Sequence, residues 1–249
     1  MRGGTPEGIT SQFFAIGGGD LPTRETFEVD KLVVQSSGRA RPWTLCITAA
    51  ADDSPEACDS FGVIYGDALR CRTDYLRLNK GEPGGDDFKR KIHRSEVFYF
   101  SDGSLARLME SLRKYDVVSD LKAAYARGAV FAGVGAGAAC MAAFGLIDEA
   151  GSDPVEGLGL VSFGICTKVE NSTSGDEPAK KASTSFGKNA VVLGYLSTLH
   201  VVEDQFEVFA SPSAEVHVVG GDNQTVYSSS TELQPLEVLS SRKGERVRV

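Results

Sequence analysis

Apolar segments alternate with amphipathic or polar segments along most of this chain. Short runs rich in Val, Ile, Phe and Tyr have the length of buried strands, and several segments between them repeat apolar positions at helical spacing. The predicted strands are residues 13–16, 43–49, 75–78, 96–101 and 129–134, and the predicted helices are residues 25–35, 54–69, 87–95, 105–114 and 117–127. Because parallel strands need crossover connections, this order predicts an α/β fold with a doubly wound, mostly parallel sheet covered on both faces.

The last third of the chain has a different pattern. Short β-like runs occur at residues 158–166, 190–196, 216–219 and 225–227, around a polar stretch at residues 171–185. No Pro-rich linker separates them from the rest, so they predict a mixed β extension of the same domain. We therefore expect one α/β domain over residues 13–249, preceded by a loose, polar N-terminus over residues 1–12.

Residues 128–147 contain no charged side chain, and their number equals that of a bilayer-spanning helix. Gly and Ala dominate the stretch, which begins with β-branched and aromatic residues and continues through a cluster of glycines. This pattern favours a buried strand, a tight turn and a buried helix over a transmembrane segment.

The composition of the chain limits which binding partners and which cellular compartment we expect. The chain has 26 Lys and Arg residues against 34 Asp and Glu residues, and a net charge of −8 disfavours non-specific binding to nucleic acid or to anionic membranes. The five cysteines are widely spaced without a CxxC pair, which argues against disulfides and a structural zinc site. The first residues lack the apolar region of a secretory signal, so we expect a cytoplasmic protein, and no metal or cofactor is predicted.

Three Gly-rich turns follow predicted strands, at residues 17–20, 101–104 and 133–138. In open α/β sheets the functional site lies beyond the carboxyl ends of the strands, so Gly18 and its counterparts in the other turns are candidate ligand-binding residues. The third turn fits a G-x-G-x-x-A dinucleotide pattern, but it follows the fifth strand, and Glu156 alone lies near the spacing of the ribose-binding acid. The same turn also suits a nucleophile elbow, with Gly135 at the elbow position.

Four segments in chain order resemble one enzyme family. They are FFAIGGGDLP, FYFSDGSLARLMESL, ARGAVFAGVGAGAAC and GLGLVSFGICTKVEN. They are similar to the opening strand and Gly-rich turn, the G-G-[DN]-[QT] turn and helix, the G-x-S-A-G-A elbow and the G-L-G-L…C-P-H-Y-D segment of the dipeptidase E and cyanophycinase serine peptidases. The resemblance covers most of residues 13–210. It implies a class I glutamine amidotransferase-like fold, a flavodoxin-like three-layer sandwich.

The resemblance also implies positions for the catalytic residues, and this chain departs from the family at the two that matter most. The family's nucleophilic serine falls on Gly135, and its histidine base falls on Lys168. The aspartate after that histidine falls on Glu170, and the family's triad acid lies near Asp148 or Glu149. A Ser-His mechanism needs a hydroxyl beside a base, and the matching positions provide neither.

The turn that would form the oxyanion hole is also changed. Its second glycine is present as Gly103, whereas its first glycine is replaced by Asp102. The companion donor would be the backbone N–H of Ala136, the residue after the elbow. A carboxylate in this turn would repel a developing oxyanion.

These replacements predict a catalytically degenerate homologue of the family. Its expected role is to bind a small acidic or peptide-like ligand, or a protein partner, and a homodimer is left open. The alternatives are a working hydrolase of Asp-containing dipeptides or related amides, which would use another nucleophile or a water activated by Glu170 or Asp148, and a structural assembly subunit. Loss of both the serine and the histidine favours natural divergence over a laboratory substitution at Gly135.

Cysteine and histidine residues elsewhere are weaker candidates. Cys140 is expected inside the Ala-rich helix after the elbow as a buried core residue. Cys166, two residues before Lys168, is the closer substitute nucleophile, because a nearby lysine lowers a thiol pKa. The histidines fall outside the family's base segment, and structural roles are expected for His200 and His217.

Overall fold

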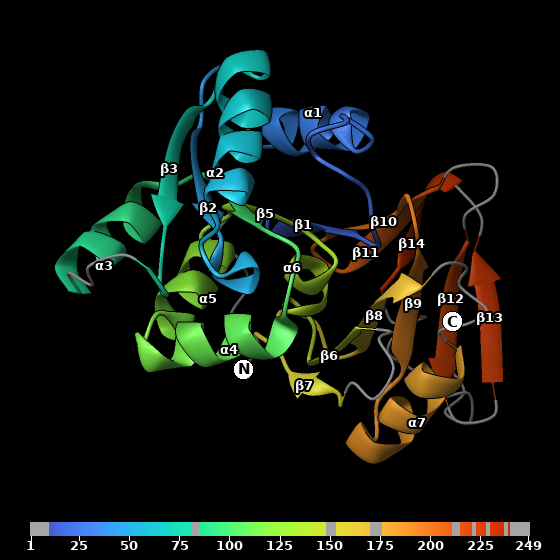
Figure 1. The fold of residues 1–249 in the computed structure, drawn as a ribbon. Helices are drawn as coiled ribbons and strands as arrows, with labels where there is room; N and C mark the ends of the chain where they lie inside the picture. The colour runs from blue at the N-terminus through green and yellow to red at the C-terminus, as the bar shows by residue number, and fades with distance from the viewer. Residues whose placement is uncertain are drawn as a thin grey trace, which may run out of the picture.

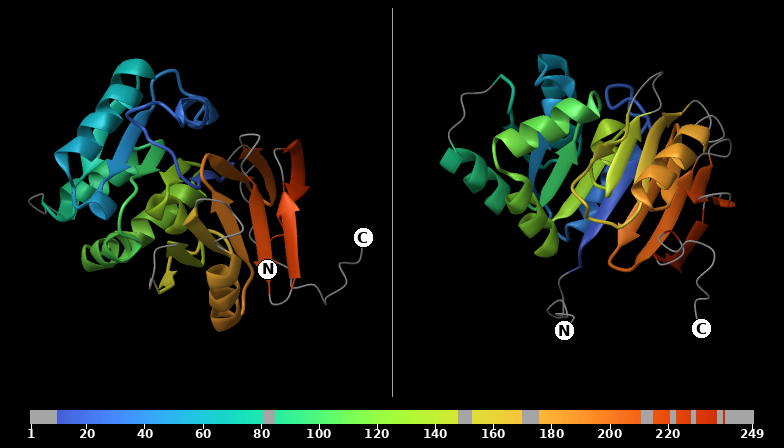
Figure 2. Two further views of the ribbon diagram at one scale, coloured as in Figure 1. Left: turned by 45° about the vertical axis from the view of Figure 1, so that its right-hand side comes forward. Right: turned by 90° about the horizontal axis from the view of Figure 1, so that it is seen from below.

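Two β-sheets and the helices that cover them form the described part of the chain (Figure 1). The structure is a computed structural model that describes residues 10–80, 85–147, 153–169, 176–210, 215–220, 223–227, 230–236 and 239. Figure 2 shows the two sheets from two further directions, with helices on their outer sides. This arrangement confirms the predicted three-layer α/β class.

The larger sheet contains the parallel strands that the sequence predicts. Its members are β1 (Gln12–Ile16), β2 (Trp43–Ile47), β3 (Arg72–Leu76), β4 (Val97–Phe100), β5 (Val130–Val134), β10 (Ser197–Val202), β11 (Gln205–Ala210) and β14 (Ser230–Pro235). Among the described residues their order is β14-β11-β10-β1-β5-β4-β2-β3. Strands β1, β5, β4, β2 and β3 are parallel, whereas β10, β11 and β14 continue the sheet in antiparallel pairing.

Helices cover both faces of the parallel strands, as the nearly continuous burial of β1, β2, β4 and β5 requires. They are α1 (Phe27–Ser36), α2 (Pro55–Phe61) with a π-helical continuation (Gly62–Ala68), α3 (Gly85–Arg94), α4 (Leu105–Lys114) and α5 (Val118–Ala126), and a 3-10 turn spans Ala49–Ala51. In β1, Phe14 and Ile16 belong to the apolar cluster under α1 and α2, while Phe13 and Ala15 belong to the cluster under α4 and α5. The alternation is that of a strand buried on both faces.

Helix α2 begins where the sequence predicts. Ser54 accepts a hydrogen bond from the Ala57 backbone N–H at 3.2 Å, and Pro55 occupies the first helical position. Both features favour a helix start, because the cap satisfies a free N–H and proline has none to satisfy.

Strands β10, β11 and β14 of the last third join the larger sheet, and the β-like runs predicted there did not include them. All four predicted runs instead contribute strands to a second sheet. Its members are β6 (Phe144–Ile147), β7 (Val155–Glu156), β8 (Gly164–Val169), β9 (Ala190–Gly194), β12 (Val216–Gly220) and β13 (Asn223–Tyr227), in the described order β13-β12-β9-β8-β6-β7. Helix α7 (Asp176–Phe186) covers one face, and the other face packs into the cluster under α4 and α5 (Figure 1).

The strand predicted over residues 158–166 begins only at Gly164. The residues before it do not pair with a strand. Their backbone N–H groups donate to carbonyl groups just after the short helix α6 (Ala136–Ala139). The backbone N–H of Leu158 donates to the Cys140 carbonyl at 2.6 Å, and that of Leu160 donates to the Met141 carbonyl at 2.9 Å. A helix end needs such partners, and they hold the segment out of a strand.

The uncharged stretch at residues 128–147 forms β5, a tight turn, α6 and β6. Its helix has only four residues, so the prediction that Cys140 lies inside a helix was wrong: Cys140 directly follows α6, where it is a buried core residue as predicted. Within the described ranges, no helix combines the length and apolar character needed to cross a membrane.

Candidate active site at the strand-to-helix elbow

Gly135 has the backbone conformation of an elbow between β5 and α6. Its φ is 54° and its ψ is −114°, a region that side-chain-bearing residues adopt only under strain. The Gly135 N–H donates to the Ile16 carbonyl at the end of β1, at 3.0 Å. Gly137 lets α6 approach β4 closely, since a Cβ there would overlap with the Phe100 carbonyl. The small residues therefore permit this turn, as predicted.

The turn after β4 lies opposite the elbow. Gly103 has a φ of 140° and packs against the backbone of Ala50, where a Cβ would overlap with the carbonyl group. The next residue, Ser104, caps helix α4 by accepting a hydrogen bond from the Arg107 N–H at 3.3 Å. The chain thus changes direction immediately after Asp102, and the Ser104 N–H donates to the Ala50 carbonyl at 2.9 Å.

The Asp102 carboxylate connects the two turns. Its Oδ1 accepts a hydrogen bond from the Gly103 N–H at 2.7 Å and another from the Ala136 N–H at 3.0 Å. A Cβ built on Gly135 would overlap with the same oxygen. The carboxylate therefore occupies the space beside the elbow where a larger residue would place its side chain, and it holds both backbone donors.

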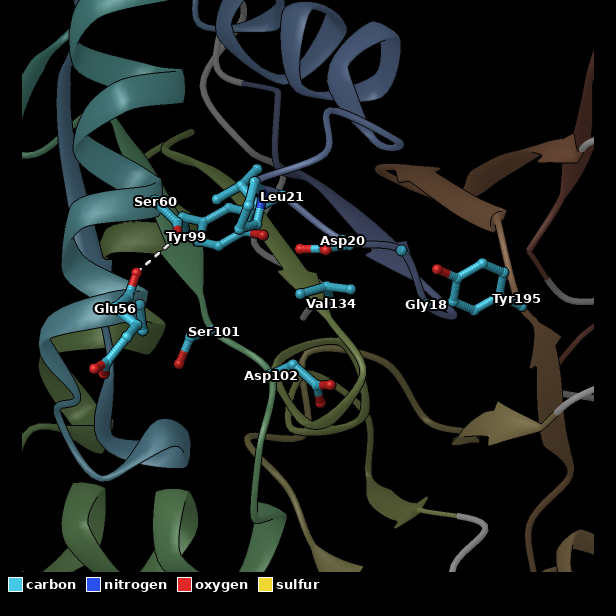
Figure 3. Close-up of a pocket in the computed structure, with 13 residues that line it drawn as sticks. Gly18, Asp20, Leu21, Glu56, Ser60, Tyr99, Ser101, Asp102, Val134 and Tyr195 are labelled. Atoms are coloured by element: carbon cyan, nitrogen blue, oxygen red, sulfur yellow. Dashed lines mark hydrogen bonds between the residues drawn. The ribbon is translucent and has the colours of Figure 1, made fainter.

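A cavity of about 740 Å³ opens in front of these turns (Figure 3). Its described lining comes from the turn after β1, the start of α2, the ends of β4 and β5, and the turn after β9. These residues are Gly18, Gly19, Asp20, Leu21, Pro22, Glu56, Ala57, Ser60, Tyr99, Ser101, Asp102, Val134 and Tyr195. The volume lies within the range of small-molecule sites, and its place at the carboxyl ends of parallel strands is where such sites form.

Tyr195 forms one wall of the cavity, and no sequence motif singled it out. Its ring packs against Gly18, where an added Cβ would lie 2.6 Å from a ring carbon. The Tyr195 hydroxyl donates to Glu25 Oε2 at 2.6 Å, and the Asp20 N–H donates to the same oxygen at 2.7 Å. These hydrogen bonds lower the pKa of Glu25 and raise the pKa of Tyr195 to about 12. Only the pairing of β10 with β1 brings Tyr195 to this turn.

Comparison with known proteins connects this geometry to one family. The model of peptidase family S51 matches residues 13–209, which include the elbow, the Asp102 turn and strand β8. The chain belongs to peptidase family S51. This membership confirms the resemblance to the dipeptidase E and cyanophycinase peptidases.

Relatives of the S51 chain support the same conclusion. It is 25% identical over 210 residues to the uncharacterized peptidase YgaJ of Bacillus subtilis (strain 168), covering 81% of this chain and 88% of that protein. A peptidase from an acI-B1 actinobacterium superposes with a TM-score of 0.71 at 18% identity, over 91% of this chain and 97% of the other. A putative peptidase E protein from Listeria monocytogenes EGD-e superposes with a TM-score of 0.60 at 12% sequence identity. The superposition covers 82% of this chain and 100% of the other. Both solved structures show the shared fold.

Five of the site residues predicted from the sequence meet at this edge of the larger sheet. Gly103 and Ala136 donate hydrogen bonds to Asp102, Gly135 lies beside the same carboxylate oxygen, and Gly18 lines the same cavity. The sequence missed Ser60, Tyr99 and Tyr195, whose residue types alone carry no signal. Ser101 lies in the Gly-rich turn at residues 101–104, but the sequence did not indicate it as a site residue.

The structure describes only the backbone at position 168, which the sequence resemblance assigns to the catalytic base. Lys168 belongs to β8, and the residue after it, Val169, pairs with Gly194 of β9. Gly194 packs against Gly17 after β1, so the backbone of β8 ends near the Gly-rich turn. Asp148, Glu149 and Glu170 lie outside the described residues.

The two cysteine candidates are not brought to the cavity. Cys140 is fully buried, its Sγ donates to the Gly137 carbonyl at 3.1 Å, and burial raises the pKa of its thiol. Cys166 is buried in the apolar cluster between the second sheet and α7. Neither is among the described lining residues. Both positions are buried among apolar residues, which is typical of core cysteines.

The two histidines in strands have the structural roles predicted for them. His200 of β10 stacks on Phe14 at 3.8 Å and lies 2.7 Å from Glu207 Oε1. His217 of β12 is buried with its Nδ1 2.9 Å from Asp176 Oδ1. The second pair has the His-Asp contact of a catalytic triad, but neither residue is among those described around the cavity.

Proposed function

We propose that this chain is a catalytically inactive member of peptidase family S51 whose cavity binds a small peptide-like ligand. One observation carries the proposal: Asp102 Oδ1 accepts the hydrogen bonds of the Gly103 and Ala136 N–H groups. In an acyl-transfer enzyme with this turn, those two donors would stabilise the oxyanion of the tetrahedral intermediate. Here the donors are already satisfied by a carboxylate, which would also repel the developing negative charge.

The nucleophile and the base support the same conclusion. Gly135 has no side chain to attack a carbonyl group, and Lys168 stands at the position that the family resemblance assigns to histidine. Lysine remains protonated near neutral pH unless its pKa is strongly lowered. The nucleophile, the base and the oxyanion hole of one mechanism are thus all replaced, as we expect of a site that does not catalyse hydrolysis.

A binding role is supported by what remains. The cavity of about 740 Å³ is still open beside the elbow, with apolar, aromatic and polar groups in its lining. A site of this size and mixed character suits recognition of a small molecule. None of the described cysteines forms a disulfide, which agrees with the expected cytoplasmic setting.

The test is hydrolysis of a dipeptide library, including Asp-X and β-linked Asp-Arg compounds, followed by mass spectrometry. Four forms are compared: the natural chain, Gly135→Ser, Asp102→Gly with Gly135→Ser, and the same pair with Lys168→His. We expect no product from the first two forms, because Asp102 still fills the oxyanion position in both. Turnover is expected to return only when Asp102 is removed and the serine and histidine are both present.

Turnover by the natural chain would overturn the proposal and favour the hydrolase alternative. The binding half is tested by the thermal midpoint of the natural chain with each dipeptide, because a ligand of the folded state raises it. Stabilisation without cleavage supports the proposal. A stable oligomer that is neither stabilised nor active would instead support the structural-subunit alternative.

A further inference from the structure

The charged side chains that line the cavity in the described part of the chain have one sign. Among the described lining residues, the ionisable acids are Asp20, Glu56 and Asp102, and none is Lys, Arg or His. Asp20 and Glu56 are exposed at the mouth, whereas Asp102 is partly buried at the turn. Figure 3 shows them on different elements around the same space, so their potentials add within it.

Two aromatic residues extend this pattern. Tyr99 and Tyr195 both line the cavity, Tyr99 from β4 and Tyr195 from the turn after β9. Aromatic faces attract cations, and a cation that loses water near them gains more than one at an open surface. The described acids do not form a group able to hold a metal ion, which favours a positive charge carried by a larger organic molecule.

Ser101 supplies a separate indication that the cavity takes a ligand. The residue is only 6% exposed, and its Oγ has no hydrogen-bond partner among the described residues. Figure 3 shows this hydroxyl in the space between Glu56 and Asp102. An unpartnered buried hydroxyl is costly, and a ligand that donates to it or accepts from it would remove that cost.

We propose that the cavity selects a cationic ligand, a small peptide or amine carrying an ammonium group, with Ser101 as a hydrogen-bond partner. The inference rests on the proposed binding function and adds the charge of the ligand. It reverses one part of the expectation from the sequence, since an acidic ligand would meet three carboxylates. A lysine-containing peptide would place its ammonium group against Asp20 or Glu56 and an aromatic ring.

The experiment measures dissociation constants of Lys-Ala, Ala-Ala and Glu-Ala by calorimetry at pH 7.5 and low salt. These peptides share a backbone and differ by one charge at a time. We expect Lys-Ala to bind about tenfold more tightly than Glu-Ala, with the difference shrinking at high salt because the mouth carboxylates are exposed. Equal affinities, or tighter binding of Glu-Ala, would overturn the proposal.

Variants assign the preference to named groups. Glu56→Gln is expected to reduce the Lys-Ala preference about threefold, and Asp20→Asn provides a second variant if the first folds poorly. Glu203→Gln is the matched control: it removes the same charge at the far end of β1, where the Glu203 N–H donates to the Ser11 carbonyl. Ser101→Ala should weaken all three peptides about fivefold, the effect of one hydrogen bond.

The same samples separate this inference from the proposed function. Mass spectrometry of each mixture after calorimetry reports cleavage. Cleaved peptide would overturn the proposed function whatever the affinities are. Uncleaved peptide bound without charge preference, or a Glu203→Gln effect as large as that of Glu56→Gln, would overturn only the cationic-ligand proposal.

Discussion

The Asp102 carboxylate fills the space into which a side chain at position 135 would extend, since a Cβ built on Gly135 would overlap with Asp102 Oδ1. The same Asp102 oxygen holds the N–H groups of Gly103 and Ala136. The family resemblance implies a glycine at the first position and a serine at the second. Here the aspartate and the glycine are complementary in volume, so either replacement alone creates a conflict or a gap.

This relationship predicts coupled stabilities. Gly135→Ala should lower the free energy of unfolding by about 2–4 kcal/mol, from the strained backbone and the overlap with Asp102. Adding Asp102→Gly should recover about 1–2 kcal/mol of that loss, giving a non-additive double-mutant cycle in urea unfolding. Gly38→Ala is the matched control, since Gly38 has a φ of 64° and no atom within 4 Å of an added Cβ. Simple additivity would contradict the steric relationship.

A buried acid predicts a pH-dependent stability. Asp30 is fully buried, and accepts hydrogen bonds from Thr26 at 2.8 Å and Tyr65 at 2.7 Å, but burial raises its pKa to about 6. The folded state thus binds the proton more tightly than the unfolded chain, whose Asp pKa is about 3.9. Protonation of Asp30 therefore adds to the free energy of unfolding. This contribution is complete below about pH 4 and is lost as the pH rises through about 6.

The measurement is urea unfolding of the natural chain and of Asp30→Asn between pH 4 and pH 7. The natural chain should lose about 2–3 kcal/mol relative to the variant over this range, because the amide does not titrate. Other carboxylates cancel in the difference. A difference that stays constant with pH would show that Asp30 does not titrate in this window.

The buried cysteines predict a chain without an accessible thiol. Cys46, Cys58, Cys71, Cys140 and Cys166 are all buried, and none of them forms a disulfide. We expect Ellman's reagent to label none of them within minutes in the native protein and all five after unfolding in urea. Rapid labelling of one thiol in the native state, located by peptide mapping, would revive a cysteine nucleophile.

The triad-like pair of His217 and Asp176 predicts a stability effect without a binding effect. His217→Ala removes the imidazole that lies 2.9 Å from the buried Asp176 carboxylate, and loss of this contact should cost about 3–5 kcal/mol in the free energy of unfolding. Binding of Lys-Ala to the folded fraction should stay unchanged. His93→Ala, at an exposed position of α3, serves as the control and should change stability by less than about 0.5 kcal/mol. A change in affinity with His217→Ala would connect the pair to the cavity.

Local patterns in the sequence were enough for the parallel half of the fold. Apolar runs such as that of β5 and the cap at Ser54 act within a few residues, and they predicted five strands and the helices between them close to their observed bounds. The glycines around position 135 likewise implied an elbow, because their lack of a side chain is a local property. The strand predicted to start at Leu158 failed because its backbone groups bind carbonyls after α6, a contact that the local pattern does not contain.

By itself, then, the sequence determined the α/β class, the strand-to-helix elbow and the absence of a serine and a histidine from their matching positions. The tertiary structure alone decided that Asp102 Oδ1 meets the N–H of Ala136, that Tyr195 closes the cavity against Gly18, and that Cys166 faces the core. The physical reason is distance along the chain. Residues 34 and more than 170 positions apart meet only because β4, β5, β10 and β1 lie beside one another in one sheet.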